Sequence, residues 1–203
     1  PALAPADAGI GLSCCRSPDP CAPWCALDAS DLPFSSSFSS LPPVLTIREA
    51  HDDDAAGLIA LIGGVFAEYP GCVMDVDGEL PELRAIASYF REHDGEFWVS
   101  ERDGEIVGCI GYSPAKDPSG VELKKLYVHA CARKHGLGGQ LHNRVEARAR
   151  ERGARFIDLW SDTRFATAHA FYERRGYQRG ATTRELHDKS FTVEFYFRKD
   201  LAP

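Results

Sequence analysis

The chain has 203 residues, a formal net charge of −7 at pH 7 and an isoelectric point near 5.5. Hydrophobic residues make up 44% and charged residues 26%, proportions that are typical of a soluble globular protein. The acidic balance argues against a nucleic-acid binder, and no apolar run approaches the roughly 18 residues of a membrane span. We therefore expect neither a nucleic-acid nor a membrane partner. The negative charge suits an amine-bearing substrate.

The first 43 residues differ in composition from the rest of the chain. They hold eight of the 13 prolines, four of the seven cysteines and a serine-rich run over 35–40. Because they show neither helical nor strand periodicity, we predict a poorly ordered extension over 1–43 and one domain over 44–203. The extension lacks the basic start and apolar run of a secretory signal and is too acidic for a transit peptide, so we expect a cytoplasmic protein.

The cysteines give no metal signature. Those of the extension show no paired C-x-x-C spacing and have no histidine nearby, so a zinc site is disfavoured and we expect no bound metal. The other cysteines are scattered singly, as expected of small buried hydrophobes in a reducing compartment: Cys72, Cys109 and Cys131.

The first half of the predicted domain begins with a strand and two helices. An alternating run over 44–48 predicts the strand, and the aspartates at 52–54 are expected to cap a helix whose apolar face runs over 58–66. Pro81 suits the start of a second helix that ends at Gly95. The dipeptide Asp103-Gly104 between two apolar runs then predicts a β-hairpin.

The second half alternates strands and helices. The pattern predicts a strand over 121–128, a helix over 136–152, a short strand over 156–160, a helix ended by Gly176 and a last strand over 191–197. This order combines antiparallel hairpins with at least one β-α-β crossover.

The loop between the strand 121–128 and the following helix indicates chemistry. It is basic and glycine-rich, with Arg133, Lys134 and His135 before the first glycine. Glycines let the backbone approach an anion, and the free N–H groups and dipole of a helix start favour phosphate. The loop lacks the Walker pattern and the spacing of a dinucleotide-binding fold. On its own it is also compatible with a mobile turn that has a basic rim.

Two motifs surround this loop at a defined spacing. The first is Leu126-Tyr127-Val128 followed by Arg133-x-x-Gly136-x-Gly138, and the second is Ala168-x-x-Phe171-Tyr172-Glu173-x-x-Gly176-Tyr177. Together they resemble the acetyl-CoA motif and a second signature of the GNAT superfamily of N-acetyltransferases, and the resemblance covers 44–200. It implies an α/β (α+β) fold: a mixed, mostly antiparallel sheet with a β-α-β acetyl-CoA-binding core and helices on both faces.

The resemblance also implies acetyl-CoA as co-substrate. The backbone at Leu126 and Val128 would pair with the pantetheine arm, the Val128 N–H would stabilise negative charge on the thioester oxygen, and the loop would hold the pyrophosphate. As side chains, Leu126 and Val128 are equally compatible with core packing. The residues that the resemblance assigns to acetyl-CoA are Leu126, Tyr127, Val128, Arg133, Lys134, His135, Gly136, Leu137, Gly138, Gly139 and Gln140.

The catalytic residues that the resemblance implies are Tyr172 and Glu122. Tyr172 stands where the family keeps a tyrosine acid, and a phenol of pKa about 10 can protonate a leaving thiolate; the alternative is a packed aromatic. Glu122 is the candidate base, because a period of two would place it on one strand face with Lys124, Leu126 and Val128.

Two points about the catalytic site stay open in the sequence. Glu122 is equally compatible with an exposed glutamate that pairs with a neighbouring lysine, and His129 is a second candidate base. Many members of the family carry an asparagine seven residues before the tyrosine, whereas this chain has Phe165. Asp162 and Thr163 are the candidates to replace that asparagine.

The acceptor site in this family is built largely from the segment between the first two strands. Acidic residues there would attract a cation, and the alternative is a solvated acidic loop. The residues that we expect to bind the acceptor are Glu68, Tyr69, Asp75 and Asp77. The function implied is transfer of an acetyl group to a primary amine of a small molecule, a polyamine or a lysine or peptide, by direct attack through a tetrahedral intermediate.

Two further expectations accompany this function. The family resemblance admits a homodimer. The alternative to an enzyme is a non-catalytic acyl-CoA-binding or interaction module whose cysteine-bearing extension recruits a partner.

Overall fold

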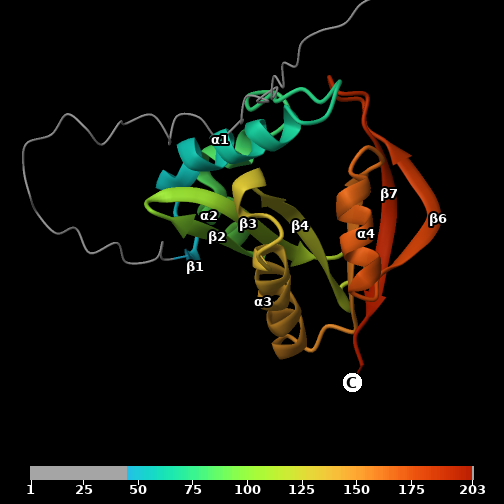
Figure 1. The fold of residues 1–203 in the computed structure, drawn as a ribbon. Helices are drawn as coiled ribbons and strands as arrows, with labels where there is room; N and C mark the ends of the chain where they lie inside the picture. The colour runs from blue at the N-terminus through green and yellow to red at the C-terminus, as the bar shows by residue number, and fades with distance from the viewer. Residues whose placement is uncertain (1–44, 203) are drawn as a thin grey trace, which may run out of the picture. The chain divides into compact units, whose positions relative to one another are not determined.

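The computed structural model describes residues 45–202 and contains one seven-stranded sheet (Figure 1). The predicted extension over 1–43, with its four cysteines and the disfavoured zinc site, lies outside the described residues. Strand order in the sheet is β1-β2-β3-β4-β5-β7-β6, and every neighbouring pair is antiparallel except β4 and β5. The strands are β1 (Leu45–Glu49), β2 (Glu96–Arg102), β3 (Glu105–Pro114), β4 (Gly120–Val128), β5 (Phe156–Asp162), β6 (Gln178–Glu185) and β7 (Val193–Asp200).

Helices cover both faces of the sheet, as the resemblance implied. One face carries α1 and α2, whose core includes Leu58, Ile86, Phe90 and Phe97. The other face carries α3 and α4, whose core includes Leu141 and Tyr172. No helix within 45–202 is long and apolar enough to cross a membrane. The helices are η1 (Asp52–Asp54), α1 (Ala55–Phe66), η2 (Pro81–Ala85), α2 (Ile86–Glu92), η3 (Ala130–Ala132), α3 (Leu137–Glu151) and α4 (Ala166–Arg174).

The predicted hairpin is confirmed. Arg102 and Glu105 pair across the turn, and the two residues between them, Asp103 and Gly104, have φ of 53° and 85°. Positive φ at both central positions is what a two-residue hairpin of primed type requires, and Asp-Gly supplies it at low cost.

Strand β4 contains a bulge that changes which side chains share a face. Its pairing with β3 shifts between Cys109 and Gly111, and Lys125 has a φ of 54°. Val121 and Leu123 lie in the α3/α4 core, and Leu126 and Val128 pack against that same core. The prediction that Glu122, Lys124, Leu126 and Val128 share one face is therefore wrong, because the bulge inserts one residue and reverses the alternation.

Strands β4 and β5 pair over only three residues and then separate. The paired residues are Gly120 with Phe156, Val121 with Ile157 and Glu122 with Asp158. Both strands continue beyond this point, β4 to Val128 and β5 to Asp162, without pairing to each other. The sheet therefore splays at its centre, and the facing edges of the two strands are free to bind an extended ligand.

Three expectations about elements are corrected. Strand β6 was not predicted, because its sequence is polar and almost wholly exposed. The last strand begins at Val193, whereas Phe191 lies before it, 86% exposed and with a φ of 48°. Asp54 makes no side-chain cap on α1 itself, because its carboxylate binds Arg48 at 2.8 Å and accepts the His51 N–H at 2.7 Å, which caps the preceding turn η1.

Candidate active site

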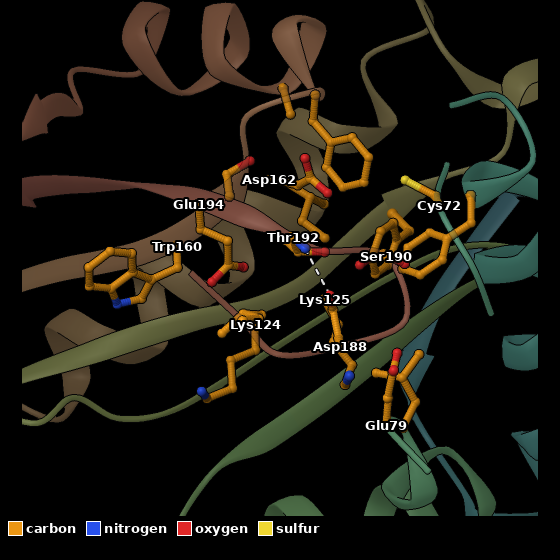
Figure 2. A pocket seen from close by; sticks show the side chains of 18 of the residues that line it. Cys72, Glu79, Lys124, Lys125, Trp160, Asp162, Asp188, Ser190, Thr192 and Glu194 are labelled. Carbon is orange, nitrogen blue, oxygen red and sulfur yellow. Dashed lines mark hydrogen bonds between the residues drawn. The ribbon is translucent and has the colours of Figure 1, made fainter. Parts of the chain in front are cut away.

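A cavity of about 520 Å³ lies where β4 and β5 separate (Figure 2). Its wall comes from the segment after α1, from β4, β5 and α4, and from the β6–β7 hairpin with its connecting loop. The loops on the two sides of the cavity are bonded to each other, since the Val73 N–H donates to Ser190 Oγ at 2.8 Å and the Lys189 N–H donates to Glu79 Oε1 at 2.6 Å. Segments more than 100 residues apart in the chain therefore form one wall.

Tyr172 reaches this cavity from α4. Its ring packs 5.9 Å from Phe197 and 5.6 Å from Tyr177 in the α3/α4 core, while the residue also lines the cavity. No hydrogen-bond partner of its hydroxyl is found among residues 45–202. Burial raises the pKa of Tyr172 above that of a free phenol, so the group is a protonated donor at neutral pH.

The face of the sheet opposite the α3/α4 core supplies the cavity with charged side chains. Alternation with the buried Val121, Leu159 and Phe197 places Glu122, Trp160 and Glu194 on that face. Six carboxylates line the cavity, and four of them are paired with the four Lys and Arg side chains that line it. The pairs are Glu122–Lys124, Glu82–Lys125, Asp162–Arg164 and Glu194–Arg184, and the two remaining carboxylates are Glu79 and Asp188.

Glu122 lies at the vertex of the splay. Its Oε1 is 2.9 Å from Lys124 Nζ, which is the neighbouring-lysine pairing that the sequence left open. Its partner across the parallel pair is Asp158, whose Oδ2 accepts a bond from the Tyr196 hydroxyl at 3.0 Å. Burial, together with the nearby Glu122, raises the pKa of Asp158.

The glycine-rich loop presents free N–H groups at the start of α3. The Arg133 N–H donates to Ala130 O and the Gln140 N–H donates to Gly136 O. The six N–H groups between them, over 134–139, find no acceptor among the described residues. Lys134 and Gly136 have φ of 65° and 83°, which turns the chain into a helix that has no side-chain cap. Such a nest of N–H groups binds an anion.

The end of β4 leads from the cavity to this loop. The Gly108–Val128 pair is flanked by a bond from the His129 N–H to Val107 O at 2.9 Å. Because bonds alternate along an antiparallel ladder, the Val128 N–H points away from β3, toward the side of β5. The Arg133 guanidinium binds back to Val128 O at 2.8 Å and pairs with Glu68. The Arg133 side chain is thus engaged within the protein.

The four residues expected to bind the acceptor do not line the cavity. Glu68 pairs with Arg133, Asp75 with Lys189 and Asp77 with Arg84. The sequence made the segment look acidic because these cationic partners come from other parts of the chain. The fourth residue, Tyr69, packs 4.6 Å from Phe165. The same segment does contribute to the cavity, through Cys72, Val73, Glu79 and Leu80.

The remaining predicted residues fall as follows. Phe165 lines the cavity, where it packs on Tyr69 and Phe66. Asp162 also lines it, but its carboxylate binds the Arg164 side chain and backbone N–H. His129 lies outside the lining, with Nδ1 2.9 Å from Cys131 Sγ.

Of the three described cysteines Cys109 is fully buried as expected, whereas Cys72 and Cys131 are half-buried. Among residues 45–202 no group of three or more His, Cys, Asp or Glu side chains is placed to hold a metal ion.

Several cavity residues were missed by the sequence analysis. Trp160, Arg184 and Glu194 come from strands of the C-terminal half, and Asp188 comes from the loop between the last two. Only the alternation of β7 could have indicated Glu194, because it places two aromatic residues on one face of the strand and Glu194 on the other. Arg184 had no signal, since β6 itself was not predicted.

The fold and the cavity together define an acyl-group transferase that takes an extended acyl carrier between two splayed strands. The residues fit acetyl-CoA on two observations: the free edges of β4 and β5, and the six unbonded N–H groups at the start of α3. The family model described as "Acetyltransferase (GNAT) family" matches residues 27–177. The chain belongs to the GNAT acetyltransferase family.

Individual relatives agree with this assignment. A protein named "Probable N-acetyltransferase 14" from Xenopus tropicalis is 30% identical over 122 residues, which are 60% of this chain and 58% of that protein. An amino-acid acetyltransferase of Azotobacter vinelandii is 37% identical over 132 residues, 65% of this chain and 27% of that protein. The chain thus spans less than two thirds of the length of these relatives.

A solved structure shows the same fold. The PaiA N-acetyltransferase of Thermoplasma acidophilum, in complex with coenzyme A, matches with a TM-score of 0.61 at 18% identity and covers 78% of this chain and 99% of that one. The expected fold class is confirmed.

Proposed function

We propose that this protein transfers the acetyl group of acetyl-CoA to a primary amine of a cationic acceptor bound in the splay cavity. The observation that carries the proposal is the charge of the cavity, where six carboxylates face four Lys and Arg side chains. Each of the four cations is already paired, which leaves Glu79 and Asp188 to attract positive charge. The names of the amino-acid acetyltransferase relatives make an amino acid one candidate acceptor. The surplus of carboxylates favours a polyamine or a lysine side chain over a zwitterion.

The proposed cofactor site extends from the cavity to α3. The N–H groups over 134–139 bind the pyrophosphate, and the backbone at Leu126 and Val128 pairs with the pantetheine arm. The N–H group of Arg133, which we expected to bind the pyrophosphate, is bonded within the protein, as is that of the neighbouring Gln140, so both residues serve the loop indirectly. The Val128 N–H faces the thioester oxygen and stabilises the charge that develops on it.

In the proposed chemistry two residues move protons. Tyr172 donates its proton to the thiolate that leaves when the tetrahedral intermediate collapses, and its raised pKa keeps that proton in place until then. Glu122 receives a proton from the acceptor side through water, since its own oxygen is bonded to Lys124. A cytoplasmic location and a homodimer are expectations that accompany this proposal.

The test is release of coenzyme A from acetyl-CoA, followed with a thiol reagent across polyamines, aminoglycosides, amino acids and lysine peptides. The cysteines of the extension are blocked first, because they react with the same reagent. We expect amine-dependent release that is strongest with multiply charged amines. Binding of acetyl-CoA without release for any amine would contradict the proposal and favour a non-catalytic acyl-CoA-binding module.

A further inference from the structure

Glu194 lines the cavity beyond the point where β4 and β5 stop pairing. It pairs with Asp162 across the β5–β7 ladder, four residues beyond Asp158. At about 3.3 Å per residue, this position is about 13 Å along the strands from the vertex at Glu122 and Asp158. On the other side of the splay Leu126 and Val128 also lie beyond Glu122, although the bulge at Lys125 shortens that stretch of β4 by one residue. Glu194 therefore lies past the vertex, toward the end of β4, whereas Glu122 stands at the vertex itself.

The side chain of Glu194 is held inside the cavity wall. It is 14% exposed, and its Oε2 is 2.5 Å from Arg184 Nε. Arg184 in turn lies 4.5 Å over the ring of Trp160, which fixes the guanidinium against the wall. One carboxylate oxygen of Glu194 accepts from Arg184, so the other remains for an acceptor amine.

Charged groups act on Glu194 from the two strands that flank β7 and from β4 beyond β5. Arg184 faces it from β6, Asp162 from β5 and Glu122 from β4. Burial raises the pKa of Tyr127, and the charges of Tyr172 and Glu194 act in the same direction. Burial raises the pKa of Glu194, and the negative charges of Asp162 and Glu122 act in the same direction, while Arg184 opposes them.

We propose that Glu194 is a further catalytic residue, which binds the acceptor ammonium beside the thioester and accepts its proton directly. This inference rests on the proposed function. The position beyond the vertex of the splay, the burial in the cavity wall and the pairing with Arg184 support it. A carboxylate that binds protons more readily than a free glutamate is a better acceptor for the proton of an ammonium group.

The protons and bonds balance as follows. One proton of the acceptor ammonium moves directly to Glu194, in place of the water-mediated transfer to Glu122, and the nitrogen lone pair then forms a bond to the acetyl carbon. The carbon–sulfur bond breaks with its electron pair on sulfur, and Tyr172 protonates that sulfur. Tyr172 recovers a proton from the attacking nitrogen, and Glu194 releases its own to solvent. The net products are the acetylated amine, free coenzyme A and one proton.

The experiment compares four variants in the full chain: Glu194→Gln, Arg184→Ala, Glu122→Gln and Glu185→Gln. Glu185 is an exposed glutamate of the same hairpin that does not line the cavity, so its variant is the matched control. We expect Glu194→Gln to lower kcat/KM by about 100-fold or more and to remove the acid limb of its pH profile, with acetyl-CoA affinity unchanged. Arg184→Ala should move that limb to higher pH, because the cation that lowers the pKa of Glu194 is gone. Glu185→Gln should match the wild type.

A second readout does not depend on turnover. Carbon-13 NMR of glutamate-labelled protein follows the Glu194 carboxyl, identified by its loss in Glu194→Gln. Titration above the ordinary range of a glutamate, shifted upward in Arg184→Ala, supports the proposal. Titration of Glu194 in the ordinary range of a glutamate overturns the proposal. The proposal is also overturned if Glu122→Gln removes the acid limb of the kcat/KM pH profile and Glu194→Gln leaves it in place. Absence of amine-dependent coenzyme A release by the wild type would instead contradict the proposed function.

Discussion

Tyr172 and Glu194 reach the same cavity from opposite faces of the sheet. Tyr172 belongs to α4 and packs in the α3/α4 core. Glu194 lies three residues before the buried Phe197 on β7, so strand alternation places its side chain on the other face of the sheet. The two faces connect only because β4 and β5 stop pairing after Glu122 and Asp158. In the proposed mechanism, the splay would let Tyr172 serve the leaving thiolate and Glu194 serve the incoming amine at one thioester.

The first prediction concerns Tyr172. Tyr172→Phe keeps the ring that packs near Phe197 and Tyr177 and removes only the hydroxyl, for which the described residues offer no hydrogen-bond partner. We expect kcat to fall by about 100-fold, because the thiolate loses its proton donor, while folding and acetyl-CoA affinity persist. Coenzyme A release and calorimetry measure the two quantities. An unchanged kcat would show that Tyr172 is a packing residue only.

The second prediction concerns the nest of N–H groups at α3. Gly136 has a φ of 83° and Gly153 a φ of 70°, and a Cβ at either position would meet nothing within 4 Å. Alanine at either position should therefore cost about 1 kcal/mol of stability from the left-handed backbone alone. Gly136 is in the loop and Gly153 lies beyond the far end of α3. Only Gly136→Ala should weaken acetyl-CoA binding, and equal affinity of the two variants would exclude the loop as the pyrophosphate site.

The loop and the element order were predictable because they depend on local chemistry. Glycine at positive φ, an Asp-Gly turn and the helical spacing of apolar residues are properties of neighbouring residues. The bulge at Lys125 was not predictable in this way, because it is an insertion in a pairing between β3 and β4. The extra residue reverses the alternation of every later residue in β4. Strict alternation therefore predicted that Glu122 and Leu126 share a face, whereas they lie on opposite faces.

The residues predicted to bind the acceptor lie outside the cavity lining for a related reason. Glu68 and Asp75 are acidic in the sequence, yet their cationic partners Arg133 and Lys189 lie 65 and 114 positions away. Charge pairing over such separations depends on the tertiary fold. The same limit hid Glu194, whose cavity position follows from strands β5, β6 and β7 being neighbours.

The third prediction concerns Phe165, which stands where many family members carry asparagine. Its ring lines the cavity and packs 4.6 Å from Tyr69. Phe165→Ala should enlarge the acceptor side of the cavity, raise KM for the amine and leave acetyl-CoA affinity unchanged. We expect a stability loss of about 2 kcal/mol, less than for a fully buried ring. Phe191→Ala is the stability control, because that ring is 86% exposed. A shift in acetyl-CoA affinity alone would place Phe165 on the cofactor side.

The fourth prediction concerns the pH dependence of stability. His142 on α3 is fully buried, with Nε2 2.9 Å from the Tyr177 hydroxyl and Nδ1 3.3 Å from Arg175 Nη1. Burial, reinforced by Arg175, lowers its pKa to about 3. In the unfolded chain this imidazole titrates near its ordinary value of about 6.5. Between these two pKa values the unfolded state binds one more proton, so stability falls as the pH falls.

Urea unfolding at a series of pH values measures this contribution. From pH 6 to pH 4 the wild type should lose about 1.4 kcal/mol per pH unit more than His142→Gln, whose side chain does not titrate. His142→Gln should also be less stable than the wild type at pH 7, because it disturbs the contacts with Tyr177 and Arg175. The control is His93→Gln, an exposed histidine at the end of α2, which should keep the wild-type slope. Equal slopes for His142→Gln and the wild type would mean that His142 accepts a proton in the folded state, with Glu146, 3.8 Å away, as its counter-ion.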